Sequence, residues 1–491
     1  MLAISSMRAS VLRPFAQCAR TSYLRTPVAS TRSIWTSISR TATRTPSTTG
    51  ILRNPQICKK FDVFWNSKRS TSSSTAPSTT PPASEAELPI LPSKSVGIWL
   101  MVSSTLVFAI IVVGGVTRLT ESGLSITEWK PVTGIIPPLA QEDWEEEFTK
   151  YKATPEFKLL NHSFEMDDFK RIFYMEWGHR VLGRLIGVAF VGPLVYFAIK
   201  RRISRPLALR LGGLALLIGA QGALGWYMVK SGLEDSLMDT PGAVPRVSQY
   251  RLASHLGLAF LLYAGMFSTG MAIIKESKFV HSAVDKWMGM NSVAFNESLR
   301  RMSVEAFRAR AWILTALVFV TALSGAFVAG LDAGLLYNEF PLMGGKLAPP
   351  KDELMSPAYA KRPDGSFQWW RNIFENPVTV QFDHRVLAMT SYLGISLLFL
   401  RARGLRHTLP PATMTSMNAA LAMVNIQLLL GISTLIHLVP VSLATAHQAG
   451  SVALLSTMIH VLLTLRRPSA AARAWRTFYT ARSTPPPKVQ T

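Results

Sequence analysis

Long apolar segments alternate with polar ones along most of the chain after residue 95. Each apolar segment has the length that an α-helix needs to cross a bilayer, about 20 residues. We therefore expect one membrane-spanning helix from each segment. The expected spans are residues 96–116, 173–199, 207–229, 249–274, 311–331, 377–400, 417–436 and 440–465. This pattern predicts an all-α membrane protein with eight transmembrane helices.

The residue pattern of the first four spans recurs in the last four. The matching segments are Glu176-Trp-Gly-His179-Arg180 with Gln381-Phe-Asp-His384-Arg385, residues 221–225 with 427–431, and Gly115 with residues 119–123 against Gly325 with residues 331–334. We therefore expect two duplicated four-helix bundles, residues 96–274 and 311–467. A basic connector, residues 275–310, would join them on the matrix side.

The two ends of the chain differ from the spans in composition. Residues 1–60 are rich in Arg, Ser and Thr and contain no Asp or Glu, which is typical of a mitochondrial transit peptide. A basic tail that binds nucleic acid is the alternative, and the membrane body that follows disfavours it. Residues 61–95 are rich in Ser, Thr and Pro and predict a disordered linker, and residues 468–491 predict a matrix tail. Cys18 and Cys58 are the only cysteines, so a cleaved protein would have no disulfide.

The distribution of charge sets an expected orientation. Only 16% of the residues are charged and the mean hydropathy is +0.22, which excludes an ordinary soluble protein. Lys and Arg gather in the connectors that follow the even-numbered spans, at residues 200–205, 275–310, 401–406 and 466–467. Basic connectors stay on the side from which the protein inserts. This places the protein in the mitochondrial inner membrane with both termini on the matrix side. The long loops after spans one and five would lie in the intermembrane space.

Four of the nine histidines lie near the start of an even-numbered span: His179, His255, His384 and His447. All even-numbered spans begin on the same side, so the four rings should lie at similar depth, one pair in each half. Two imidazoles on facing helices can bind a haem iron as axial ligands. The alternative is four isolated histidines with structural hydrogen bonds. The remaining histidines are interpreted as structural or surface residues: His162, His281, His407, His437 and His460.

Charged residues accompany the first histidine of each half. Arg180 and Arg385 directly follow these histidines, and a guanidinium can bind the propionates of a haem; lipid phosphates or loop carboxylates are the alternative ligands. Ionisable residues at the mouth of a membrane helix indicate a functional site. Glu176 has Gln381 as its counterpart, so we expect acid–base chemistry in the N-terminal half only. The alternative is that Glu176 merely orients the histidine or pairs with the arginine.

A di-iron carboxylate site is a second metal hypothesis. Glu-x-x-His is also the repeating unit of di-iron bundles, which need two copies and two further glutamates. The second copy in this chain has Gln381 in place of the glutamate, and spans four and eight supply no inward glutamate. The di-iron hypothesis is therefore disfavoured.

Taken together, these motifs resemble those of the haem A synthases of the mitochondrial type. The resemblance covers residues 96–467 and rests on residues 114–125, on residues 176–180 and on the segments around His255, His384 and His447. It implies an inner-membrane oxidoreductase that oxidises the C8 methyl group of haem O to a formyl group. The product, haem A, would serve cytochrome c oxidase.

The resemblance also assigns a different role to each half. It implies that His384 and His447 are the axial ligands of a resident haem b. It implies that His179 and His255 hold the substrate haem O, with Glu176 as the catalytic carboxylate beside it. The new oxygen atom would come from water or from dioxygen, and the sequence does not choose between them.

Several partners follow from the resemblance. It implies a matrix ferredoxin as electron donor, and we expect contacts with haem O synthase, with oxidase assembly factors and with membrane lipid, and allow for a homo-oligomer. Many bacterial members carry a cysteine pair in the extracytoplasmic loop, but none occurs here between Glu121 and Arg171. Two alternative functions remain: a dihaem b-type electron-transfer cytochrome, and a proton-coupled transporter, which the internal repeat would favour.

Overall fold

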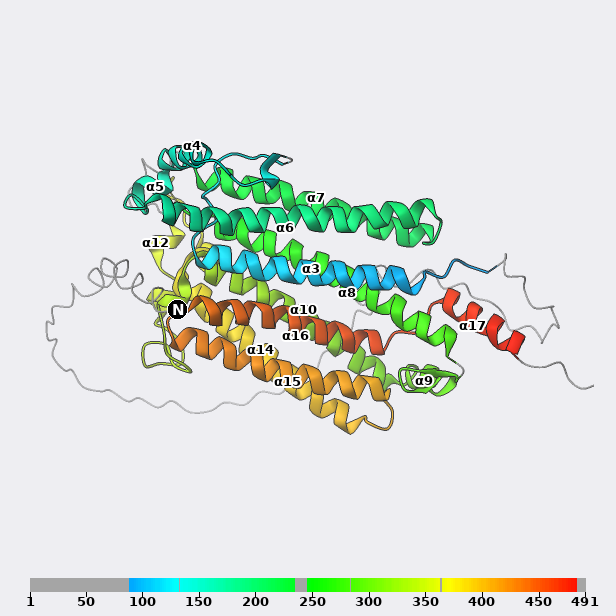
Figure 1. The fold of residues 1–491 in the computed structure, drawn as a ribbon. Helices are drawn as coiled ribbons and strands as arrows, with labels where there is room; N and C mark the ends of the chain where they lie inside the picture. Colours follow the sequence, from blue (N-terminus) through cyan, green and yellow to red (C-terminus); the bar gives the residue numbers. More distant parts are fainter. Residues whose placement is uncertain (1–87, 132, 235–244, 283, 363, 484–491) are drawn as a thin grey trace, which may run out of the picture. The chain divides into compact units, whose positions relative to one another are not determined.

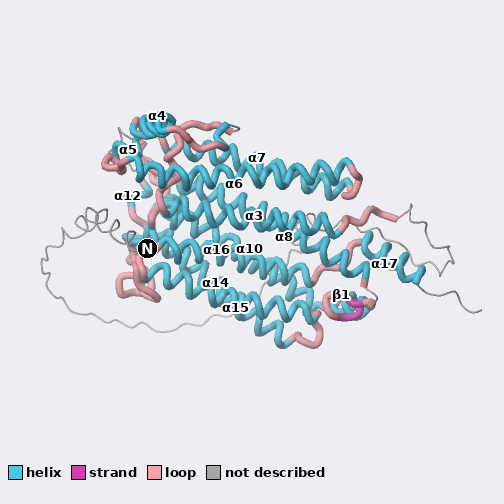
Figure 2. Tube along the Cα trace, in the orientation of Figure 1, coloured by secondary structure: helices cyan, strands magenta, loops and turns pink. Residues whose placement is uncertain are grey.

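A computed structural model describes residues 88–131, 133–234, 245–282, 284–362 and 364–483. The expected transit peptide, both cysteines and most of the expected linker lie outside the described residues. Helices make up nearly all of the regular structure (Figure 2). The strands within the described residues are the two short antiparallel partners β1 (Lys286–Trp287) and β2 (Met290–Asn291).

Eight of the described helices are long and apolar enough to cross a membrane. They are α3 (Lys94–Leu119), α6 (Met166–Ile199), α7 (Arg205–Gly232), α8 (Gln249–His281), α10 (Met302–Gly330), α14 (Pro377–Gly404), α15 (Pro411–Ile436) and α16 (Val441–Thr464). Large apolar side chains such as Val188 and Leu216 point outward from them and are 73% and 78% exposed, as expected for surfaces that face lipid. The predicted all-α, multispan membrane fold is confirmed.

The shorter elements lie between the long helices. They are α4 (Gln141–Lys152), α5 (Pro155–Leu159), α9 (Ser292–Ser298), α11 (Lys351–Leu354), α12 (Pro357–Ala360), α13 (Asn372–Glu375) and α17 (Ala470–Ser483), with the 3₁₀ helices η3 (Thr133–Ile135), η5 (Ala333–Leu335) and η6 (Trp369–Arg371). Helices α4, α5 and α12 gather at one end of the long helices, and α9 and α17 at the other (Figure 1).

Each half of the chain packs its four long helices as a closed ring of neighbours. In the N-terminal half, α3 and α7 each contact both α6 and α8. In the C-terminal half, α10 and α15 each contact both α14 and α16. The helices that carry the paired histidines therefore lie diagonally across each ring. Contacts of α8 with α10 and of α16 with α3 join the two rings. A duplicated chain would produce this arrangement, although the duplication itself stays a prediction.

Helices α6 and α10 are among the long helices that begin earlier than their hydropathy predicts. Helix α6 begins at Met166 rather than at residue 173, because Phe169 and Phe173 in its first turns pack against Trp144 and Tyr151 of α4. Similarly, α10 begins at Met302 rather than at residue 311. Packing against other parts of the protein, rather than apolar composition, stabilises these extensions.

The expected matrix tail contains a helix that is docked onto the body. Helix α17 packs against α8, and Ala472 in its first turn is fully buried. Arg476 donates a hydrogen bond from Nη1 to the backbone oxygen of Phe279 at 2.5 Å. The guanidinium also lies 4.5 Å from the centroid of the Phe279 ring. Residues 470–483 are therefore part of the folded body.

Helices α3 and α8 approach each other closely at two glycines, Gly97 and Gly270. A Cβ atom on Gly270 would lie 2.9 Å from Cβ of Leu100 and 3.0 Å from the backbone oxygen of Gly97. Small residues of this kind let membrane helices pack backbone to backbone. Because α3 and α8 also contact the C-terminal ring, this close contact lies at the junction of the two rings.

We predict that Gly270→Leu lowers the stability of the folded protein by about 1–3 kcal/mol, because the new side chain has no space between α3 and α8. The measurement is the thermal unfolding midpoint in detergent. Gly213→Leu is the matched control, since a Cβ atom on this glycine of α7 would meet nothing within 4 Å. Equal midpoints for the two variants would contradict the prediction.

Candidate functional site

The structure brings together both predicted pairs of histidines. His179 on α6 and His255 on α8 lie in the N-terminal ring, and His384 on α14 and His447 on α16 lie in the C-terminal ring. The helices surround all four imidazoles, yet each residue keeps part of its surface accessible. The rings therefore line space inside the two bundles instead of being packed into solid core.

The C-terminal pair has the spacing of two ligands of one metal ion. The ring centroids of His384 and His447 are 6.4 Å apart, and the ring planes are inclined by 86°. Two imidazoles that bind one ion from opposite sides, each with a metal–nitrogen distance of about 2 Å, have centroids roughly 6 Å apart. The arrangement fits a haem iron between the two rings.

Each of the four imidazoles lies against a glycine of a neighbouring helix. A Cβ atom on Gly114 would lie 3.0 Å from Cε1 of His179, and one on Gly325 would lie 3.2 Å from Cε1 of His384. The corresponding distances are 3.6 Å between Gly225 and His255 and 2.9 Å between Gly431 and His447. A Cβ atom would crowd the ring at Gly114, Gly325 and Gly431 and would make only ordinary contact at Gly225, so the first three positions give the imidazoles their space.

The comparison of the two halves needs one correction, because Gly115 is not the counterpart of Gly325. Gly114 is the residue that faces a histidine. Gly115 instead makes room for Gln448 of α16, whose Oε1 would lie 1.9 Å from a Cβ atom at this position. Gln448 donates from Nε2 to the backbone oxygen of Ile111 at 2.9 Å and so connects the two rings of helices.

Two glutamines hold the ligand helices in the same way in each half. Gln221 donates from Nε2 to the backbone oxygen of His255 at 3.0 Å, and Gln427 does the same to His447 at 2.8 Å. The repeat in the sequence aligns these two glutamines. The structure shows that both glutamines bind the backbone at the second histidine of each pair.

No group of three or more His, Cys, Asp or Glu side chains among the described residues is placed to hold a metal ion. The di-iron hypothesis requires such a group, so the described part of the chain does not support it. A haem brings four nitrogen ligands of its own and needs only one or two from the protein. Paired imidazoles with neighbouring space therefore fit a haem.

Glu176 is a fully engaged carboxylate at the start of the N-terminal site. It is 3% exposed. Its Oε2 accepts hydrogen bonds from Oγ of Ser125 at 2.7 Å and from the backbone N–H of Ile126 at 2.9 Å. Its Oε1 accepts from Nη2 of Arg180 at 2.6 Å and from Nε at 3.1 Å. The carboxylate thus fastens the loop after α3 to α6, which the sequence did not predict, and it makes the pairing with Arg180 that the sequence analysis gives as an alternative.

Gln381 performs the same fastening with opposite hydrogen-bond polarity. Its Nε2 donates to the backbone oxygen of Ala333 at 2.9 Å and lies 3.4 Å from that of Tyr337. Where the N-terminal loop offers donors to Glu176, the C-terminal loop therefore offers acceptors to an amide. Each loop thus offers the hydrogen-bonding groups that its own residue needs. Of these two equivalent positions, only the N-terminal one has a carboxylate.

The arginines next to the first histidine of each half also hold loops. Arg180 donates to the backbone oxygens of Ile126 at 2.9 Å and Glu128 at 3.2 Å. Arg385 donates to those of Tyr337 at 2.8 Å and Leu342 at 3.0 Å. Nε of Arg385 is buried without a hydrogen-bond partner. Propionate binding by the remaining N–H groups stays a prediction.

Glu156 is a buried acid that the sequence did not reveal, because it follows Thr-Pro at the start of a short helix in a polar segment. It is 3% exposed and its Oε2 has no hydrogen-bond partner. Burial raises the pKa of the Glu156 carboxyl to about 8, and the negative charge of Glu176 adds to this shift. The two carboxyl groups thus lie in different environments: Glu176 pairs with Arg180, whereas burial favours the protonated form of Glu156.

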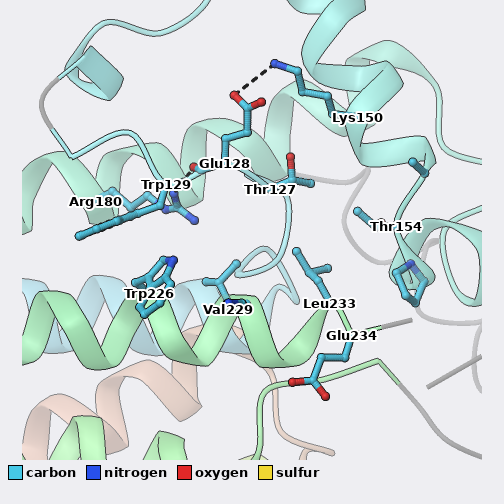
Figure 3. A pocket seen from close by; sticks show the side chains of 13 residues that line it. Thr127, Glu128, Trp129, Lys150, Thr154, Arg180, Trp226, Val229, Leu233 and Glu234 are labelled. Carbon is cyan, nitrogen blue, oxygen red and sulfur yellow. Dashed lines mark hydrogen bonds and ion pairs between the residues drawn. The ribbon is translucent and has the colours of Figure 1, made fainter. Parts of the chain in front are cut away.

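A cavity of about 850 Å³ opens beside Arg180, within the usual size range of ligand pockets. Figure 3 shows Trp129 above Trp226 at one side of the cavity, where their ring centroids are 5.6 Å apart. Nζ of Lys230 lies 5.3 Å from the centroid of the Trp226 ring. Lys150 also lines the cavity and pairs with Glu128 at 3.3 Å. The cavity therefore combines aromatic surface with cations on the N-terminal half.

The fold and the two histidine pairs define a multispan membrane protein with the ligand sets of haem sites. Comparison with known proteins gives the family. Residues 97–459 match the model of the COX15-CtaA family, described as cytochrome oxidase assembly protein. The chain belongs to this family, and the resemblance inferred from the motifs is confirmed.

Three relatives illustrate the similarity. The heme A synthase COX15 of Saccharomyces cerevisiae is 47% identical over 381 residues, which are 78% of this chain and 77% of that protein. The heme A synthase COX15 of Homo sapiens is 43% identical over 381 residues, 77% of this chain and 85% of that one. A heme A synthase-mitochondrial ferredoxin fusion protein of Schizosaccharomyces pombe is 46% identical over 427 residues, 87% of this chain and 68% of that one.

We predict that the wild-type protein becomes less stable as the pH rises and that Glu156→Gln abolishes this pH dependence. Between the ordinary pKa of a glutamate carboxyl, 4.5, and the folded value of about 8, the folded state holds a proton that the unfolded state has released. Stability therefore falls across this window, by on the order of a few kcal/mol. Thermal unfolding in detergent at pH 5 and pH 9 measures the change.

The control for this prediction is Glu142→Gln, which changes an exposed glutamate of α4. This variant should keep the wild-type pH dependence. If Glu156→Gln also keeps it, the neutral state of Glu156 is contradicted.

Proposed function

We propose that the protein oxidises the C8 methyl group of haem O to a formyl group in its N-terminal bundle, next to a resident haem b in its C-terminal bundle. Haem A synthesis is the function of the relatives that the chain matches. The observation that carries the proposal is the presence of two diagonal histidine pairs; among the described residues, only the N-terminal pair has a buried carboxylate one helical turn before its first histidine.

The C-terminal pair supports the assignment of the resident haem. His384 and His447 have the separation of two axial ligands, and Gln427 fixes the backbone at the second of them. The position equivalent to the acid is the neutral Gln381, which is committed to loop carbonyls. Such a site suits a haem that only accepts and passes on electrons.

The N-terminal pair supports the assignment of the substrate. His179 and His255 would hold haem O, and the macrocycle would bring its methyl group to the site. Oxidation of that group withdraws electrons from the methyl carbon, so positive charge develops there. Glu176 is preorganised by its hydrogen bonds as a fixed negative charge and would stabilise this change. The cavity beside Arg180 gives a small molecule access to the same end of the bundle.

The redox partners and the location belong to the same proposal. Oxidation of the methyl group to a formyl group removes four electrons; if dioxygen is the oxidant, a donor must also supply two electrons for each dioxygen that is reduced. The fission yeast relative combines a heme A synthase with a mitochondrial ferredoxin in one chain, which supports a ferredoxin as redox partner. The basic connectors after the even-numbered spans support a matrix location for both termini. The composition of residues 1–60 supports import into mitochondria and insertion into the inner membrane.

We predict that Glu176→Gln lowers haem A formation by roughly 100-fold or more while the resident haem b stays bound. The measurement is haem A content in a host that supplies only haem O, alongside a pyridine haemochrome assay of the purified protein. Wild-type protein should produce haem A in this host. A b-type haem without haem A would instead indicate an electron-transfer cytochrome, and a protein without haem would indicate a transporter.

Glu176 also holds the loop after α3, so this prediction needs a control that separates the two roles. Ser125→Ala removes one of the loop contacts and keeps the negative charge. We expect it to retain most of the haem A formation. Equal losses in the two variants would assign Glu176 to loop structure, and normal product from Glu176→Gln would end its catalytic assignment.

We predict that His384→Ala and His447→Ala each remove the low-spin spectrum of the resident haem, because each deletes one axial ligand. The measurement is the absorbance spectrum of the reduced protein. His437→Ala is the control, since this exposed residue contacts the backbone of Ser433 at 2.8 Å and belongs to neither pair. An unchanged spectrum in either ligand variant would show that another residue holds the haem.

A further inference from the structure

The four candidate ligands differ in what their second ring nitrogen contacts. Nδ1 of His384 lies 2.7 Å from Oγ of Ser324. The Nδ1 atoms of His179, His255 and His447 are buried without a hydrogen-bond partner. His384 is therefore the only one of these four described rings with a partner at Nδ1.

The hydrogen bonds around Ser324 determine the tautomer of His384. Oγ of Ser324 donates its single hydrogen to the backbone oxygen of Thr321 at 2.7 Å. A hydroxyl has no second hydrogen to give, so at Nδ1 it must accept. The proton of His384 is therefore on Nδ1, and Nε2 presents its lone pair to the interior of the bundle.

A wider polar contact fixes this arrangement between α10 and α14. Oγ1 of Thr321 donates to the backbone oxygen of Leu317 at 2.8 Å and lies 3.0 Å from Oγ of Ser391 on α14. The hydroxyl that orients His384 therefore belongs to a group that also ties the two helices together. Ring orientation and helix packing depend on the same three hydroxyl residues.

The N-terminal half has apolar residues at all the corresponding positions. Relative to the facing glycines, Gly114 and Gly325, the counterpart of Ser324 is Val113 and the counterpart of Thr321 is Ile110. Ile186 follows His179 at the same interval as Ser391 follows His384. The hydroxyl group that contacts the histidine is thus present in the C-terminal half, and the described residues of the N-terminal half have no equivalent next to His179.

A hydrogen bond from the second nitrogen makes a ligating imidazole more basic and fixes its orientation. We infer that Ser324 is a positioning residue that makes His384 a strong, permanent haem ligand, whereas His179 and His255 lack this support so that the N-terminal bundle can release its haem as product. This inference rests on the proposed function, because it assumes a resident haem in one bundle and a substrate in the other.

The first test is Ser324→Ala in the full-length, haem-loaded protein. Haem b should move to a haem-scavenging apo-globin about 10- to 100-fold faster than from the wild type. Its midpoint potential should rise, because a less basic imidazole stabilises the oxidised iron less. Absorbance follows the transfer, and a spectroelectrochemical titration gives the potential. Ser324→Thr keeps the hydroxyl and should retain the wild-type values.

Ser104→Ala is the matched control. Ser104 is buried on α3 and donates to the backbone oxygen of Met101 at 2.8 Å, the same bond within its helix that Ser324 makes, and it lies outside both histidine pairs. This variant should leave haem transfer and midpoint potential unchanged. Equal acceleration of haem loss in both serine variants would assign the effect to helix loosening and overturn the inference.

The reciprocal variant is Val113→Ser, which places a hydroxyl opposite His179. It should slow the release of haem from the N-terminal bundle, and this measurement decides the inference even if Ser324→Ala fails to fold. Wild-type release from Val113→Ser, or wild-type transfer and potential in Ser324→Ala, would overturn it. If His384→Ala nevertheless loses haem b, the proposed function stands without the inference; if His384→Ala retains haem b, the ligand assignment itself fails.

Discussion

Four imidazole rings fit inside the two helical bundles because each lies against a glycine on a neighbouring helix. This contact constrains the rest of the structure. Each helix that carries one of these histidines has a glycine of an adjacent helix beside the ring, and glutamines hold the backbone at His255 and His447. Close packing elsewhere, as between Gly97 and Gly270, keeps the helices near enough for these contacts to persist. The proposed haem sites would thus depend as much on missing side chains as on the histidines themselves.

The two halves share this frame and differ in the polar residues placed on it. The N-terminal half has a carboxylate at Glu176 and apolar residues behind His179. The C-terminal half has an amide at Gln381 and a hydroxyl of Ser324 behind His384. A carboxylate beside histidines that lack a hydrogen bond at Nδ1 would suit a substrate haem that must leave. A neutral amide beside a histidine with such a hydrogen bond would suit a resident haem. A few side-chain changes therefore separate two functions on one architecture.

The sequence predicted what is encoded locally and missed what depends on packing. The eight spans and the histidine pairs could be predicted because hydropathy, charge and spacing are local properties. Glu156 lies in a polar segment, and its burial follows only from the way the loop folds over α6. The docking of α17 and the early start of α6 likewise depend on contacts with distant residues. The loop donates hydrogen bonds to Glu176 but accepts them from Gln381. This difference could not be predicted, because the sequence does not show which loop atoms each side chain contacts.

The side chain of Gln448 also links the helices of the two histidine pairs mechanically. It follows His447 directly and reaches across to Ile111 on α3, one turn before the glycine that faces His179. Helix α16 also packs directly against α3, so this hydrogen bond belongs to a contact between the helix that carries His447 and the helix that faces His179. A shift of either helix would therefore strain its contact with the other.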